Sequence, residues 1–109
     1  MSTFHGIAVY KYKGDGCLNG IWSNSGTIGS LMNECLKKVD DAIGDDCICG
    51  EYKMTYMEAD GTTINGKVII TKKGHTYQFD WYKDSGKQMF TGIGLKTGKS
   101  HYSVSYIKV

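Results

Sequence analysis

The chain has 109 residues, 40% of them hydrophobic, with 15 glycines, no proline and a formal net charge of +2. This length fits one domain over residues 1–109, and apolar runs such as Val68-Ile69-Ile70 are far shorter than the roughly 20 residues of a membrane-spanning helix. All 13 basic residues are lysine. Because only arginine offers a bidentate guanidinium, we expect neither a clamp for acidic substrates nor base-specific recognition of nucleic acid.

Alternation of apolar and polar residues, interrupted by glycine-containing turns, runs along most of the chain and predicts β-strands. The seven expected strands cover residues 7–13, 17–22, 51–58, 62–71, 75–82, 88–94 and 102–106. Asp-Gly pairs between them are typical of tight hairpin turns. Since the connections are short, consecutive strands are expected to be antiparallel neighbours in an up-and-down meander.

Three expected strands contain a glycine near the middle: Gly20, Gly66 and Gly92. Such glycines are useful where a strand bends or approaches another closely. A meander that bends in this way closes on itself, which also removes the exposed edges through which sheets associate. The sequence therefore predicts an all-β fold, an antiparallel up-and-down meander closing into a barrel of about seven to eight strands.

The segment over residues 30–44 has a different pattern. Its apolar residues at helical spacing are Leu31, Cys35, Val39 and Ile43. Ser30 and Gly44 are residue types that cap helix starts and ends, so a short helix over about 31–43 is expected to cover one mouth of the barrel. The alternative is a strand from Thr27 to Leu36, which would bring the strand count to eight.

Four cysteines, Cys17, Cys35, Cys47 and Cys49, allow three disulfide pairings. One residue separates Cys47 from Cys49, whereas zinc modules use spacers of two to four residues, and no histidine lies near a cysteine in the sequence. We expect thiols, with a Cys17–Cys35 bridge as the alternative. No metal site and no cofactor are expected.

Several motifs resemble catalytic or nucleic-acid-binding signatures only in part. The segment from Gly94 to Ser100 ends like a phosphate-binding loop, but its glycine spacing differs and a strand follows it instead of a helix. The aromatic run from Lys73 to Phe79 has polar residues where an RNA-binding sheet has aromatic or aliphatic ones. No serine lies in a Gly-x-Ser-x-Gly motif. We therefore expect no catalytic residues, no enzyme activity and no nucleic-acid partner.

The stretch Leu18-Asn19-Gly20-Ile21-Trp22-Ser23-Asn24-Ser25-Gly26-Thr27 resembles the first strand and turn of avidin-like barrels, and its Gly-x-Trp is also similar to lipocalins. Weaker similarity continues in the same order through Gly50-Glu51-Tyr52, Phe79-Asp80-Trp81 and Phe90-Thr91-Gly92, so that roughly half the chain is covered. Both families are calycins, which form up-and-down β-barrels. The last two expected strands are also similar to uncharacterised small bacterial β-domains.

The avidin resemblance implies that Asn24, with Ser25 or Thr27, makes polar contacts to a cyclic ligand. It implies that Tyr52 donates a hydrogen bond beside them. The chain departs from the pattern of both families, because the turn is one residue shorter than in avidin, the tryptophan that avidin subunits share has no counterpart, and the arginine that packs on the lipocalin tryptophan is missing. Biotin is therefore not the expected ligand.

Aromatic residues recur on one face of the expected strands, and a small barrel either fills with side chains or holds one small ligand. The expected ligand-binding residues are Trp22, Asn24, Tyr52, Tyr56, Tyr77, Phe79, Trp81, Phe90 and Tyr106. In the avidin resemblance, Trp81 and Phe90 correspond to apolar walls. Because a buried tyrosine needs a partner for its hydroxyl group, so many tyrosines on this face indicate an apolar pocket with polar points.

The expected function is non-enzymatic binding of a small, largely apolar molecule inside the barrel. The alternative is a structural or protein-interaction domain with a barrel filled by side chains and a basic outer face, since residues 61–109 contain eight lysines and two acidic residues. The first residues lack the basic and apolar regions of a secretory signal, so a cytoplasmic location is expected.

Overall fold

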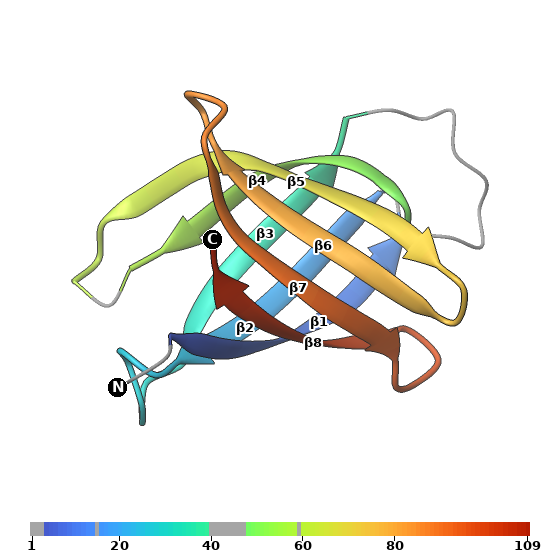
Figure 1. Cartoon of the computed structure of the whole chain (residues 1–109), viewed down its shortest axis with the longest axis horizontal. Coiled ribbons are helices and arrows are strands. Elements are labelled where there is room, and N and C mark those ends of the chain that lie inside the picture. Colours follow the sequence, from blue (N-terminus) through green and yellow to red (C-terminus); the bar gives the residue numbers. More distant parts are fainter. Residues whose placement is uncertain (1–3, 15, 40–47, 59) are drawn as a thin grey trace.

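In a computed structural model the chain folds into a closed barrel of eight antiparallel strands (Figure 1). The structure describes residues 4–14, 16–39, 48–58 and 60–109. The strands are β1 (His5–Gly14), β2 (Cys17–Asn24), β3 (Met32–Lys38), β4 (Gly50–Met57), β5 (Thr63–Lys73), β6 (Thr76–Lys83), β7 (Gln88–Lys96) and β8 (His101–Lys108). Each strand pairs with the next one, and β8 pairs with β1. The predicted all-β meander that closes into a barrel is confirmed.

Tight turns keep consecutive strands adjacent. Gly74 between β5 and β6 and Gly86 between β6 and β7 have φ angles of 60° and 93°. These angles lie in the left-handed region, which glycine adopts readily and residues with a Cβ disfavour. Because the chain reverses within a few residues at such points, the order of strands in the sequence becomes their order around the barrel.

Residues Met32–Lys38 form strand β3, so the helix expected over about 31–43 is wrong in the part of it that the structure describes; residues 40–47 lie outside the described residues. The inward side chains of β3 are Met32, Glu34 and Leu36. The residues that carried the helical spacing, Leu31, Cys35 and Val39, are exposed. Strand β3 pairs with β2 and β4, and a helix in its place would leave both neighbours with an unpaired edge.

The cysteines differ from one another in state. The thiol of Cys35 is free on the outer side of β3, and no bridge joins it to Cys17. Cys49 takes part in a disulfide, which corrects the expectation of thiols at this position. Cys47 lies outside the described residues. The barrel does not depend on a bridge between β2 and β3.

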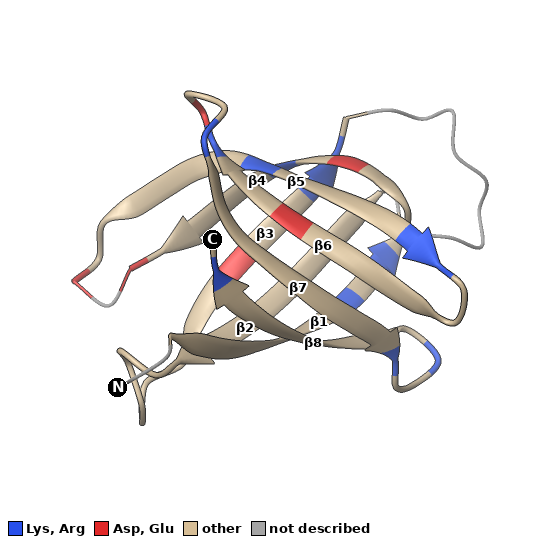
Figure 2. Ribbon diagram, viewed as in Figure 1, with Lys and Arg blue, Asp and Glu red and all other residues tan. Residues whose placement is uncertain are grey.

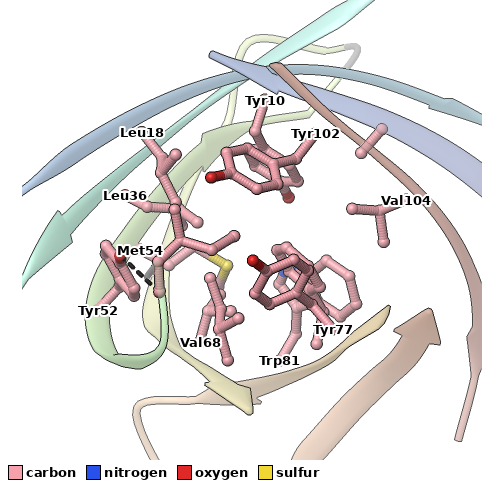
Figure 3. Close-up of a cluster of buried hydrophobic side chains, with 14 of the residues drawn as sticks. Tyr10, Leu18, Leu36, Tyr52, Met54, Val68, Tyr77, Trp81, Tyr102 and Val104 are labelled. Atoms are coloured by element: carbon pink, nitrogen blue, oxygen red, sulfur yellow. Dashed lines mark hydrogen bonds between the residues drawn. The ribbon is translucent and has the colours of Figure 1, made fainter. Parts of the chain in front are cut away.

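One half of the barrel interior is filled by buried side chains of the core cluster, several of which Figure 3 labels. We call this half the packed end; it is the end at which β1, β3, β5 and β7 finish, on the right of Figure 1. Its buried side chains include Leu18, Leu36, Tyr52, Met54, Ile70, Tyr77, Tyr102 and Val104. The hydroxyl of Tyr52 donates a hydrogen bond of 2.7 Å to the carbonyl oxygen of Ile48, which holds the segment before β4 against this end.

The other end of the barrel, at which β2, β4, β6 and β8 finish, is called the open end below. Phe79 separates the two halves, since its ring stacks on Tyr10 at a centroid distance of 5.5 Å and on Trp81 at 5.7 Å. Among the residues that the structure describes, none belongs to a helix of the length and hydrophobicity needed to cross a bilayer.

Candidate ligand-binding pocket

The open end contains a cavity of about 220 Å³. Its lining includes six of the nine residues expected to bind a ligand: Trp22, Asn24, Tyr56, Trp81, Phe90 and Tyr106. They come from β2, β4, β6, β7 and β8, so the closure of the barrel brings them together. The two tryptophans and their aromatic neighbours therefore surround one space, as the alternation in the sequence indicated.

Three of the expected residues lie elsewhere in the barrel. Tyr52 and Tyr77 are buried at the packed end, and Phe79 lies beneath the cavity, against Tyr10 and Trp81. Tyr77 packs edge-on against Tyr102 with ring centroids 5.6 Å apart. These residues face the barrel interior, but they fill it at a different height from the cavity lining.

Six further residues line the cavity and were not among those expected: Phe4, Ala8, Tyr10, Thr27, Glu34 and Glu58. For Thr27, the avidin resemblance alone implies a contact with a ligand. Glu34 is the most important residue missing from the expected set. The helix expected over about 31–43 included it, and so gave it no place inside the barrel. The alternation of Met32, Glu34 and Leu36 was the signal that places it inward.

Glu34 belongs to a cross-strand row in which Tyr10 of β1 pairs with Gly20 of β2, and Gly20 pairs with Glu34 of β3. A Cβ at position 20 would lie 2.6 Å from Cε1 of the Tyr10 ring. Because glycine leaves this space empty, the ring extends across β2 and its hydroxyl donates a hydrogen bond to Oε1 of Glu34. The glycine predicted to mark a bend thus makes room for a side-chain contact.

Glu34 is only 6% exposed. Its Oε2 accepts a 3.1 Å hydrogen bond from Nε1 of Trp81, in addition to the bond from Tyr10 to Oε1. Burial disfavours the charged form and raises the pKa of Glu34 from 4.5 to about 7, although the two hydrogen bonds act in the opposite direction. The floor of the cavity therefore carries a carboxyl group that changes its charge near neutral pH.

The walls are aromatic rings in mutual contact. Tyr106 lies 5.4 Å from both Trp81 and Phe90, measured between ring centroids. Trp22 packs edge-on against Tyr56 on the other side, at 5.4 Å and an interplanar angle of 88°. Edge-to-face contacts of this kind are favourable for aromatic quadrupoles. The walls are thus braced against one another and hold a preformed shape.

The turn after β2 supplies part of the rim. Oδ1 of Asn24 accepts hydrogen bonds from the backbone N–H of Gly26 at 2.9 Å and from the hydroxyl of Thr27 at 3.2 Å. Its Nδ2 donates to the hydroxyl of Tyr106 at 3.3 Å. Asn24 therefore already orders the rim, and a ligand would share its amide group with these partners.

The indole N–H of Trp22 is a buried hydrogen-bond donor in the lining. Nε1 of Trp22 is buried and has no hydrogen-bond partner among the described residues. A buried N–H without a partner costs free energy, about 1–3 kcal/mol, and such groups are uncommon in native proteins. An acceptor atom on a molecule in the cavity would satisfy it.

The residue types of the lining are suited to binding a molecule by apolar contacts and a few hydrogen bonds. It consists of aromatic residues, one alanine, two neutral polar residues and two glutamates. In the part of the chain that the structure describes, no cluster of three or more histidine, cysteine or acidic side chains has the geometry of a metal site. Both oxygens of Glu34 are held by fixed donors, an arrangement suited to orienting a bound molecule.

Comparison of the chain with protein-family models, with curated proteins and with solved structures finds no match. The eight-stranded closed meander is consistent with the barrel that the avidin and lipocalin resemblance implied. The finer assignment to those families has no support from the comparisons.

Proposed function

We propose that the protein binds a small, largely apolar molecule in the cavity at the open end of the barrel and does not transform it. The observation that carries this proposal is the unequal filling of the barrel. Side chains pack one half of the interior, while the other half leaves about 220 Å³ between aromatic walls. Small-molecule sites are concave and mostly apolar, with a few placed polar groups, and this cavity has those properties.

The size of the cavity indicates a compact ligand. A cavity of about 150 Å³ is enough to hold benzene, so this one has room for one ring with a short substituent. Seven of its twelve lining residues are aromatic, and aromatic side chains provide large contact areas at low cost in conformational entropy. The buried N–H of Trp22, which no described residue satisfies, supports an occupant with an acceptor atom.

Both tryptophans of the chain, Trp22 and Trp81, line the cavity. Their fluorescence should therefore respond to an occupant. We would titrate the folded protein with a set of small aromatic and alicyclic compounds and follow the emission. Saturable changes with some members of the set are expected. If no compound alters the emission of a protein shown to be folded by circular dichroism, the proposal fails.

The alternative function, protein interaction through a basic outer face, depends on a different part of the molecule. Lys72 and Lys73 at the end of β5 and Lys96 at the end of β7 are exposed at the packed end, away from the cavity (Figure 2). Changing these lysines to glutamate would weaken the salt-dependent binding of a protein partner. The change in tryptophan emission on addition of a small ligand would stay the same. The two functions are therefore separable by experiment.

A further inference from the structure

The charges that line the cavity have one sign. Glu34 lies at its floor and Glu58 belongs to its exposed part, while no lysine or histidine occurs among the described residues that line it. A buried carboxylate is costly unless a positive charge compensates it. Within the described lining, a positive charge beside these carboxylates would therefore come from an occupant.

The carboxylate of Glu34 has capacity for further hydrogen bonds. An ionised carboxylate has about four acceptor positions, and the two donors present, the Tyr10 hydroxyl and the Trp81 indole N–H, take one on each oxygen. Both donors are neutral, so they orient the group without cancelling its charge. The remaining acceptor positions suit a donor that also brings a positive charge.

The aromatic walls favour the same kind of ligand. The face of an aromatic ring carries negative electrostatic potential, and cations are attracted to it, most strongly to tryptophan. Trp81 and Tyr106 contact each other beside Glu34, at a centroid distance of 5.4 Å, and Trp22 and Tyr56 form a second pair. A cation on Glu34 would lie among these rings and away from bulk water.

We propose that the ligand is a small organic ammonium ion, a protonated amine on a body of about one ring, with its ammonium group on Glu34, its apolar part between the aromatic walls and an acceptor atom on that part for the N–H of Trp22. This inference rests on the proposed function and specifies its ligand class. An anion would be repelled by both glutamates. A neutral isostere would fit the walls but leave the charge of Glu34 uncompensated.

The proposal carries a pH dependence. The groups that face Glu34 are Tyr10 from β1, Tyr56 from β4, Trp81 from β6 and Tyr106 from β8. Burial raises the pKa of Tyr56 to about 12 and raises those of Tyr10 and Tyr106 as well, so these phenols stay neutral around pH 7. Of the described groups that face it, Glu34 is then the one whose charge changes near neutral pH. With its pKa of about 7, the ionised fraction falls about tenfold between pH 8 and pH 6.

The test compares three probes of similar shape at pH 8: 2-phenylethylamine, which is positively charged, 2-phenylethanol, which is neutral, and 3-phenylpropionate, which is negatively charged. Affinities are measured by tryptophan fluorescence and calorimetry. The affinity for the amine should be at least about tenfold higher than that for the alcohol, because hydrogen bonds to charged groups are stronger. The affinity for the propionate should be the lowest of the three. Lowering the pH to 6 should weaken amine binding about tenfold and leave alcohol binding unchanged.

Glu34→Gln should abolish the preference for the amine, and saturable binding of the alcohol by this variant would show that the pocket is intact. Glu51→Gln removes the same charge from the outer side of β4 and should change neither affinity. Equal binding of amine and alcohol by the unaltered protein, or tighter binding of the propionate, would overturn the ammonium assignment and leave the pocket standing. Absence of binding by all three probes would contradict the ammonium assignment and the proposed function together.

Discussion

Tyr10 reaches Glu34 across Gly20, the residue that lies between them in the row formed by β1, β2 and β3. The contact depends on the absence of a side chain at position 20, where a Cβ would lie 2.6 Å and 2.7 Å from two carbons of the tyrosine ring. A residue of the barrel wall thereby determines how the floor of the cavity is built. Several measurable consequences arise from this arrangement.

Gly20→Ala should destabilise the protein by about 1–3 kcal/mol, since overpacking of a filled interior has costs of this order. The ring of Tyr10 is completely buried, and any shift away from a new Cβ would disturb its stacking on Phe79 and its hydrogen bond to Glu34. Chemical denaturation monitored by circular dichroism measures the loss. Gly98→Ala is the matched control, because a Cβ there meets its nearest atom at an ordinary 3.4 Å. Equal stabilities of the two variants would contradict this explanation of Gly20.

The stability of the unliganded protein should depend on the protonation of Glu34. Its pKa is about 7 in the folded state against 4.5 for the unperturbed group, so the folded state binds a proton more tightly than the unfolded state does. The free energy of unfolding should therefore contain a contribution that is complete below about pH 4.5 and is lost as the pH rises to about 7. A shift of this size corresponds to about 3 kcal/mol.

Glu34→Gln should remove this contribution, because the amide has nearly the same shape and does not titrate. Denaturation curves collected from pH 5 to pH 8 in both proteins provide the comparison. Glu51→Gln controls for net charge, since Glu51 is exposed on β4. If the unaltered protein and Glu34→Gln show the same dependence on pH, Glu34 does not have the environment described above.

Tyr10→Phe should raise the pKa of Glu34 further. The tyrosine hydroxyl donates to the carboxyl group and lowers its pKa, and phenylalanine keeps the ring but lacks that donor. The carbon-13 shift of the Glu34 carboxyl carbon, followed through a pH titration, gives the pKa directly. Tyr77→Phe, which removes a hydroxyl at the packed end, should leave the value unchanged. A lower pKa in Tyr10→Phe would contradict the direction of the hydrogen bond.

The register of β3 gives a separate prediction. Leu36 is completely buried and Cys35 is exposed, so adjacent residues should differ sharply in their contribution to stability. Leu36→Ala should cost about 2–5 kcal/mol through loss of packing and a residual cavity. Cys35→Ala should change the stability by no more than about 0.5 kcal/mol. Thermal or chemical denaturation of the two variants tests the strand, because the helical alternative places position 35 on its buried face.

The sequence was sufficient for the barrel wherever polar and apolar residues alternate in a regular way, as in β6 with Tyr77, Phe79 and Trp81 inward. It misled at β3 because Glu34, a charged residue, occupies an inward position. Because Glu34 is charged, the alternation of apolar and polar residues expected of a strand is interrupted there. The four-residue spacing of Leu31 and Cys35, typical of a helix, is then the clearer pattern. A buried charged residue thus broke the pattern by which its own strand would have been recognised.

For the site, alternation identified the face of each strand but gave no height along the barrel. Tyr52 and Tyr56 share a face of β4, yet the first is at the packed end and the second lines the cavity. The height of a residue along the barrel follows from its position within its strand. The even-numbered strands β2, β4, β6 and β8 all finish at the open end, so residues late in these strands lie near the cavity. Trp22 and Trp81 both stand late in such strands, as does Tyr56.

The central claim is that the open end of the barrel holds a small molecule between Trp22 and Trp81. The most direct measurement follows the two indole N–H signals in proton–nitrogen NMR spectra during a titration with 2-phenylethylamine and, separately, with 2-phenylethanol. The claim predicts saturable shifts of both indole signals and none at the backbone amide of Gly74, which lies at the packed end. Indole signals that stay fixed with both compounds, or shifts confined to the outer face of the barrel, would contradict it.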